Sequence, residues 1–236
     1  MPPSDVIQPV AFPRGIADVE GQHACVLDRS GRLAAIALES GTVLWRSSEA
    51  LRPLVIAHGE VIALRTGPPA VCIALALEAA NAGSPQWSSD PLPLPTWAFT
   101  DGAQLSIAAQ MRGTAIELHW LARARYRGGA APSREVREQA ARDAEGSLAV
   151  DRSSGKVTPI STPAPIVPAA AMEPGPATAD VLERQRIGEH WYQLAVAAAT
   201  NNVRTLLRAL DAKTGALRWE TTIDEGPPRA PKPLRL

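Results

Sequence analysis

The chain has 236 residues, with 24 Lys and Arg against 24 Asp and Glu, so its formal net charge is zero. Hydrophobic residues make up 45% and charged residues 20%, which excludes a disordered chain and predicts one large or two small folded domains. The neutral balance excludes a chain-wide basic field, so we expect no nucleic-acid partner. No apolar run is long enough to span a bilayer, so we expect no membrane insertion.

The N-terminal residues and the cysteines indicate a compartment. Residues 1–5 lack the basic and then apolar regions of a secretory signal. Cys25 and Cys72 stand in apolar runs, where we expect buried free thiols rather than a disulfide framework. We therefore expect a cytoplasmic protein.

Four copies of a short motif divide the chain into repeating units. In each copy an apolar run ends in an acidic residue, a polar pair leads to a glycine, and a second strand follows. A tryptophan stands four residues after the glycine in three copies, and a proline in the other. In chain order the copies are Gly41 with Trp45, Gly83 with Trp87, Gly155 with Pro159, and Gly215 with Trp219. We expect each glycine to supply the positive φ of a tight turn and each tryptophan to fill the seam against the next unit.

The spacing of the glycines predicts the architecture. Gly41 and Gly83 are 42 residues apart, the length of one four-stranded propeller blade. β-rich pairs with turn signals precede the motifs at 16–27, 54–64, 97–110 and 191–200. We therefore expect an all-β fold, a small β-propeller of about four four-stranded blades with one short helical insertion. The ring would close within the chain, or a partner or second copy would complete a larger ring.

Residues on both sides of the third motif predict a strand, an insertion and a loop. Apolar and polar residues alternate over 114–127, as in a half-buried strand. A helix is expected over 133–145, with Ser133 as its cap and Gly146 at its end, inside an insertion at about 131–146. Prolines and alanines predict an extended loop at about 159–180. The propeller-like domain is expected to cover 1–225, and 226–236 to form a basic, proline-rich tail.

Basic residues supply the candidate contact sites. Alternate positions place Arg123, Arg125 and Arg127 on one strand face. They either guard a solvated edge strand or form a site for an acidic protein surface or a phosphate. The candidate partner-binding residues, including those of the helix and the tail, are Arg123, Arg125, Arg127, Arg134, Arg137, Arg229 and Lys232.

The segment Ala209 to Trp219, with its second copy at Ala37 to Trp45, resembles the tryptophan-docking motif of quinoprotein-like β-propellers, the pyrroloquinoline-quinone type. The resemblance spans roughly 16–225 and implies structural roles for Gly41, Trp45, Gly83, Trp87, Gly155, Gly215 and Trp219. Cofactor-binding members carry an adjacent cysteine pair and a catalytic aspartate near calcium. This chain has neither, so we expect no cofactor, no metal and no quinoprotein dehydrogenase activity.

These features favour a non-catalytic propeller that acts as a scaffold or recognition subunit of a larger protein assembly. Two alternatives stay open. One is a propeller that binds a small ligand or glycan, and the other is an enzyme with a site on its loops that no motif shows. We expect no catalytic residue among the motifs, since no nucleophile or phosphate-binding pattern is present.

Overall fold

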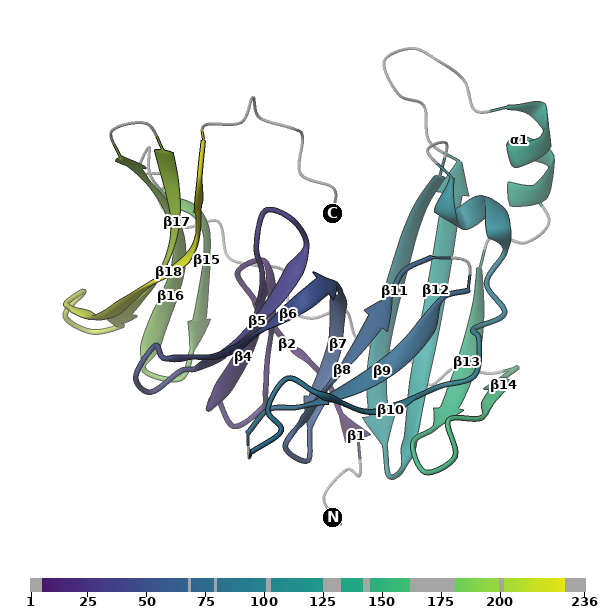
Figure 1. Ribbon diagram of the computed structural model, residues 1–236, viewed down its shortest axis with the longest axis horizontal. Helices are drawn as coiled ribbons and strands as arrows, with labels where there is room; N and C mark the ends of the chain where they lie inside the picture. Colours follow the sequence, from purple (N-terminus) through teal and green to yellow (C-terminus); the bar gives the residue numbers. More distant parts are fainter. Residues whose placement is uncertain are drawn as a thin grey trace.

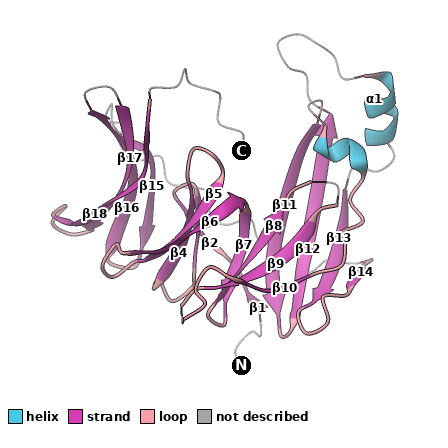
Figure 2. Ribbon diagram, viewed as in Figure 1, coloured by secondary structure: helices cyan, strands magenta, loops and turns pink. Residues whose placement is uncertain are grey.

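The computed structural model describes residues 6–67, 69–78, 80–100, 103–124, 133–141, 145–161, 181–199 and 202–227. They form four antiparallel sheets, which stand side by side with a short helix beside one of the outer sheets (Figures 1 and 2). The expected all-β fold built of propeller-like blades with one short helix is confirmed. No helix in these ranges is both long and apolar enough to cross a membrane.

Each sheet is one blade, and we number the blades in chain order. Blade 1 contains β2 (Val10–Phe12), β3 (Gly15–Ala17), β4 (His23–Leu27), β5 (Arg32–Ala37) and β6 (Val43–Ala50). Blade 2 contains β7 (Arg52–Ala57), β8 (Glu60–Arg65), β9 (Val71–Ala76) and β10 (Pro85–Ser88). Blade 3 contains β1 (Val6–Ile7), β11 (Ala103–Arg112), β12 (Ala115–Ala124), β13 (Glu145–Asp151) and β14 (Val157–Pro159). Blade 4 contains β15 (Val181–Ile187), β16 (His190–Ala199), β17 (Asn202–Asp211) and β18 (Leu217–Gly226).

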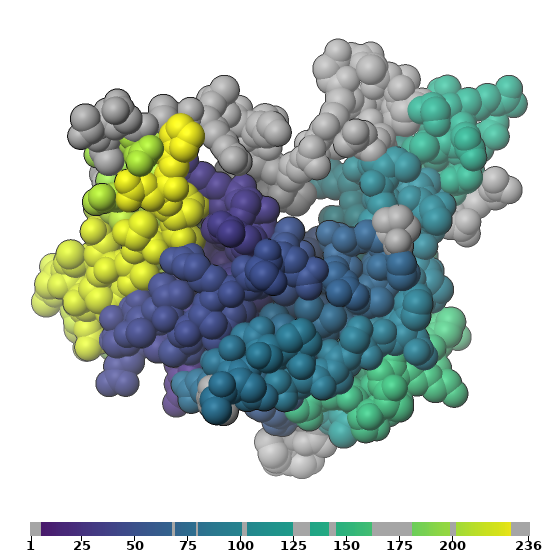
Figure 3. All heavy atoms as spheres, viewed as in Figure 1, coloured from purple at the N-terminus to yellow at the C-terminus, as the bar shows by residue number. Residues whose placement is uncertain are grey.

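The blades do not follow one another in space as they do in the chain. Blade 4 packs against blade 1, blade 1 against blade 2, and blade 2 against blade 3 (Figures 1 and 3). One buried apolar cluster fills each of these three junctions. Within the described ranges no such cluster joins blade 3 to blade 4. The array is therefore an open arc with two ends rather than a closed ring.

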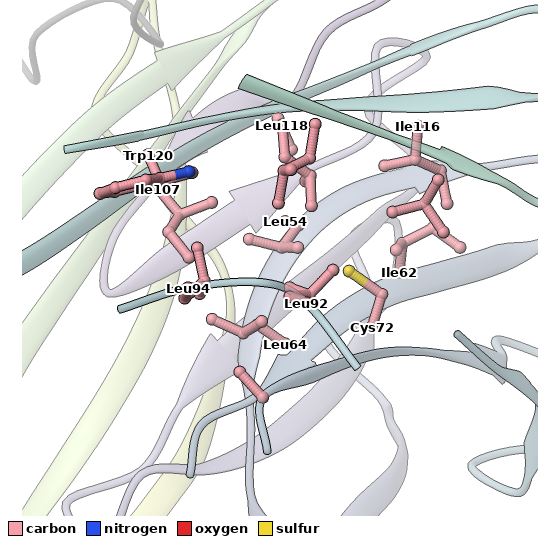
Figure 4. Close-up of a cluster of buried hydrophobic side chains, with 14 of the residues drawn as sticks. Leu54, Ile62, Leu64, Cys72, Leu92, Leu94, Ile107, Ile116, Leu118 and Trp120 are labelled. Carbon is pink, nitrogen blue, oxygen red and sulfur yellow. The ribbon is translucent and has the colours of Figure 1, made fainter. Parts of the chain in front are cut away.

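The largest cluster lies between blades 2 and 3. Leu64 and Cys72 of blade 2 meet Leu118 and Trp120 of blade 3, and Leu92 of the connecting segment lies between them (Figure 4). The predicted alternation is confirmed over β12, where every second side chain from Ile116 to Ala122 is buried. Because β12 pairs with both β11 and β13, it is an interior strand of its sheet. The interpretation of this segment as an edge strand is therefore wrong.

Several expected boundaries shift. The segment Trp97 to Gln110 begins with a 3-10 helix, η1 (Thr96–Phe99), rather than a strand. The predicted helix is confirmed as α1 (Arg134–Ala140), and the Ser133 hydroxyl accepts the N–H of Val136 at 3.2 Å. Gly146 does not end the helix as expected, because it belongs to β13 and packs under the Trp120 ring. Most of the proline- and alanine-rich loop, at 162–180, and the tail at 228–236 lie outside the described residues.

Candidate functional site

The four turns before the outer strands share one backbone geometry. Their glycines, Gly41, Gly83, Gly155 and Gly215, have φ values of 73°, 77°, 71° and 73°. In the turns that contain Gly41, Gly155 and Gly215, the glycine N–H donates to the carbonyl oxygen four residues earlier, at 2.7–2.9 Å. The Gly83 turn makes the same bond across a longer loop, to Ala76 at 2.8 Å. The four turns therefore present equivalent surfaces to whatever lies beside them.

A tryptophan covers the turn at the junction of blades 4 and 1. The ring of Trp219 lies so close to Gly41 that a Cβ added there would stand 2.5 Å from Trp219 Cε3. Trp219 Nε1 donates to the Leu38 carbonyl oxygen at 2.9 Å, and the Thr221 hydroxyl donates to the Gly41 carbonyl oxygen. Only glycine fits this position without moving the ring.

Charged groups reinforce the same junction. Arg29 of blade 1 donates its backbone N–H to Asp224 Oδ2 at 2.9 Å and its Nε to Asp224 Oδ1 at 2.8 Å. Its guanidinium also donates to the Val203 carbonyl oxygen at 2.8 Å. The guanidinium of Arg46 donates to the carbonyl oxygens of Ile223 at 2.6 Å and Thr222 at 3.0 Å. These bonds fix blade 4 on blade 1 although the two blades are far apart in the sequence.

The junction of blades 1 and 2 repeats the arrangement. Trp45 lies against Gly83, 3.0 Å from the position of an added Cβ, and its Nε1 donates to the Leu77 carbonyl oxygen at 3.0 Å. His23 of blade 1 stands between two carboxylates, 3.0 Å from Asp18 Oδ2 and 2.8 Å from Glu78 Oε1 after β9. The imidazole thus bridges the two blades beside the tryptophan.

The junction of blades 2 and 3 is a variant. An added Cβ at Gly155 would stand 2.8 Å from the Ser88 carbonyl oxygen, and Asp90 N donates to the Gly155 carbonyl oxygen at 2.8 Å. The buried Nε1 of Trp87 finds no hydrogen-bond partner among the described residues. The ion pair of Arg152 with Glu60 at 2.7 Å adds to the contact. The backbone beside Trp87, rather than its ring, covers this turn.

The fourth turn lies at one end of the arc, where none of the described residues covers it. Among these residues, an added Cβ at Gly215 would meet nothing within 4 Å. Trp191, Leu210 and Leu217 are cross-strand neighbours in the same blade, and a bulge in β18 brings Leu217 opposite Leu210. Tyr192 and Ala209 pack toward blade 1. Because side chains alternate between the two faces of a strand, the neighbouring Trp191 and Leu210 face away from blade 1. We call Trp191, Leu210, Gly215 and Leu217 the open end.

The open end is apolar at its centre and charged at its margin. Leu217 is 57% exposed, one of the most exposed large apolar side chains in the described residues. Arg184 of β15 lies over the Trp191 ring, with its Cζ 3.8 Å from the ring centroid. Apolar side chains gathered on an exposed sheet face, with charge around them, are typical of a protein interaction surface.

The opposite end of the arc is polar. On the outer face of blade 3, Gln8 donates to Gln110 at 3.2 Å and Gln110 donates to Glu117 at 2.6 Å. Arg112 pairs with Glu117 at 3.0 Å, and Gln110 is only 1% exposed. Its buried amide is therefore satisfied by side chains of the same face. Such a face resembles the polar outer surface of a capping repeat.

Three of the predicted contact residues lie in the described ranges, where they line two hollows. Arg123 lines a shallow hollow with Gln104, Ser106 and Leu121, and Arg134 and Arg137 line another with Glu138 and Ala141. The two hollows share no residue. Arg134 pairs with Glu138 at 2.6 Å along α1. The other predicted contact residues, Arg125, Arg127, Arg229 and Lys232, lie outside the described ranges.

The described ranges show how the metal-ligating residue types and the two cysteines are placed. They contain no group of three or more His, Cys, Asp and Glu side chains that could hold a metal ion. Cys25 and Cys72 are free and buried, as predicted, and burial raises the pKa of the Cys72 thiol to about 12. Burial and the nearby Asp18 raise the pKa of Cys25 further still. Neither thiol forms a thiolate nucleophile at neutral pH.

Sequence reasoning missed the open end. The signal was available, because Pro159 stands where the other three units carry a tryptophan. The chain has four glycine turns but only three tryptophans at the motif position, so one turn has no motif tryptophan to pair with it. Which turn is uncovered depends on the order of the blades in space, and the spacing of the motifs does not give that order.

A search with protein-family models finds no match, and neither does a search of curated proteins. Among solved structures, the chain is similar to BamB from Moraxella catarrhalis, with TM-score 0.37, 14% identity, and coverage of 86% of this chain and 61% of that one. It is similar to an uncharacterized protein from Listeria monocytogenes, with TM-score 0.37, 10% identity, and coverage of 93% and 66%. A europium-containing methanol dehydrogenase gives TM-score 0.34 and 11% identity, with coverage of 91% and 41%. The chain thus spans less than two thirds of the length of each of these proteins.

Proposed function

We propose that the protein is a non-catalytic scaffold or recognition subunit of a larger protein assembly, and that it acts in the cytoplasm. The observation that carries this proposal is the open end, an apolar row on the outer face of blade 4 in which Leu217 is exposed and Trp191 and Leu210 are half-buried. The two free cysteines agree with a reducing compartment.

The contrast between the two ends supports a binding role. The outer face of blade 3 satisfies its polar side chains within the chain and needs no cover. The outer face of blade 4 leaves Leu217 exposed beside a turn whose three equivalents are covered by a neighbouring blade. Burying such a row against a partner gains roughly 25 cal/mol per Å² of apolar surface. A partner therefore stabilises this end and leaves the other in solvent.

The experiment measures the native mass and composition of the particle that contains the protein in its own cells. We expect a complex whose mass exceeds that of the single chain. The variant Leu217→Glu places a charge in the apolar row and should release the single chain. Val19→Glu is the matched control, because Val19 is 53% exposed but belongs to blade 1 and not to the open end. A wild-type protein recovered alone, or a complex that survives Leu217→Glu, would overturn the proposal.

A further inference from the structure

We propose that the Gly215 turn is a docking site for a tryptophan on the outer strand of a β-blade in a partner protein. This inference rests on the proposed function and names the chemistry by which the partner is recognised. The partner's indole ring would lie on Gly215 and its N–H would reach the carbonyl oxygen of Ala212, three residues before the glycine.

The Gly215 turn matches the Gly41 turn in its glycine φ and in its backbone hydrogen bond. Both glycines have φ of 73°. Gly41 N donates to Ala37 O at 2.8 Å, and Gly215 N donates to Asp211 O at 2.9 Å. The carbonyl that receives Trp219 Nε1 belongs to Leu38, three residues before Gly41, and Ala212 holds that place before Gly215. The two turns differ in what lies on them, a tryptophan ring in one and nothing within 4 Å in the other.

The residues around the turn repeat as well. In three of the turns, an apolar residue stands five positions before the glycine and another stands two positions after it. The pairs are Ile36 and Val43 in blade 1, Val150 and Val157 in blade 3, and Leu210 and Leu217 in blade 4. Ile36 and Val150 are fully buried, and Val43 and Val157 pack against the same junction clusters. Only in blade 4 does this apolar pair lack a neighbouring blade. Leu210 and Leu217 are therefore residues of the type that a neighbouring blade buries in blades 1 and 3.

The chain itself supplies no tryptophan for this turn. All six of its tryptophans lie in the described residues. Trp45, Trp87 and Trp219 belong to the three existing junctions, and Trp97 and Trp120 are buried between blades 2 and 3. Trp191 is part of the open end.

A second copy of the chain is also a poor occupant. Its free outer strand, β14, carries Pro159 in place of the tryptophan. Its free face is the polar face of blade 3, where Gln110 and Glu117 already bond to each other. Proline has neither an aromatic ring to cover the glycine nor an N–H to donate. The occupant is therefore a blade of a different protein.

The test compares two glycines of the same blade in the complex recovered from the protein's own cells. Asparagine tolerates positive φ better than other residues, so Gly215→Asn keeps the turn and fills the space for the indole ring. Gly188→Asn is the matched control, since Gly188 has φ of 55° and also meets nothing within 4 Å. We expect Gly215→Asn to weaken the complex at least tenfold and Gly188→Asn to leave it unchanged. A benzophenone amino acid at position 216 should crosslink to a partner peptide that contains tryptophan.

The outcomes separate this inference from the proposed function. If Leu217→Glu breaks the complex while Gly215→Asn does not, the open end binds a partner without tryptophan docking. A crosslinked peptide without tryptophan overturns the inference in the same way. If the wild-type protein is recovered alone, the proposed function and the docking site both fail. A crosslink to another copy of this chain would overturn the choice of occupant.

Discussion

Replacing Gly41 with alanine measures how much the contact between blade 4 and blade 1 depends on the Trp219 ring. The new Cβ would stand 2.5 Å from Trp219 Cε3, so the ring must move. Gly215→Ala is the reference, because its turn has the same φ of 73° and its Cβ meets nothing within 4 Å. The cost of placing alanine at positive φ, about 1–2 kcal/mol, is common to both variants. The difference between them therefore reports the contacts of the new Cβ, chiefly with the Trp219 ring and also with the Thr221 hydroxyl oxygen at 2.9 Å.

The expected difference has two parts. Forcing a side chain into a packed contact costs about 1–3 kcal/mol. Moving the ring also weakens the hydrogen bond from Trp219 Nε1 to Leu38 O, worth about 1 kcal/mol. Gly41→Ala should therefore lower the free energy of unfolding by about 2–4 kcal/mol more than Gly215→Ala does.

Urea unfolding of the purified chain, followed by far-ultraviolet circular dichroism, gives both free energies. The same pair of substitutions in a Trp219→Ala background completes a double-mutant cycle. There the difference should become clearly smaller, because the ring is absent and only the contact with the Thr221 hydroxyl oxygen remains. Equal losses for Gly41→Ala and Gly215→Ala in the wild-type background would refute the role assigned to Trp219.

Three further predictions follow from burial and charge. Burial raises the pKa of Cys72 to about 12, so this thiol stays protonated in the folded state at a pH where it ionises in the unfolded state. The free energy of unfolding should therefore fall as the pH rises above about 9. Cys72→Ala should reduce that fall, as measured by urea unfolding at alkaline pH. Burial alone would raise the pKa of Asp28, but hydrogen bonds from Ser30 and Arg32 lower it. Asp28 therefore stabilises the folded state above its ordinary pKa, and this stabilisation is lost in acid. With Asp28→Asn, the free energy of unfolding measured in urea should fall less steeply as the pH is lowered. Arg29→Ala removes the guanidinium from Asp224 and from the Val203 carbonyl oxygen and should cost about 2–4 kcal/mol, with hydrogen exchange rising first in blade 4. Uniform exchange across all blades would contradict this.

Local features of the fold could be predicted from the sequence. The period of the glycine and tryptophan motif gives the length of a blade, and alternation from Ile116 to Ala122 gives a half-buried strand. Both signals come from residues that are neighbours in the chain. The Ser133 cap and the helix after it follow from equally local chemistry.

The arrangement of the blades could not be predicted in this way. Pairing of β1 with β11 and packing of blade 4 on blade 1 join residues far apart in the chain, and periodicity carries no information on them. The boundary error at Trp97 has a local cause, since Pro95 directly precedes η1 and ends the extended segment before it. The basic residues suggested a contact surface because charge is visible in a sequence. The open end consists of ordinary core residue types, so only the lack of a neighbour distinguishes it.

The position of blade 4 beside blade 1 also sets an order of assembly. The Nε1 of Trp219 bonds to the carbonyl oxygen of Leu38 across 181 residues of sequence, so this junction has no partner until the last blade has been synthesised. Blades 1, 2 and 3 follow one another in the chain and can pack as they emerge. Until then, the face of blade 1 that contains Val26 and Ile36 is open to solvent. Closing so long a loop is slow, which makes this face the point at which a nascent chain is most exposed to aggregation.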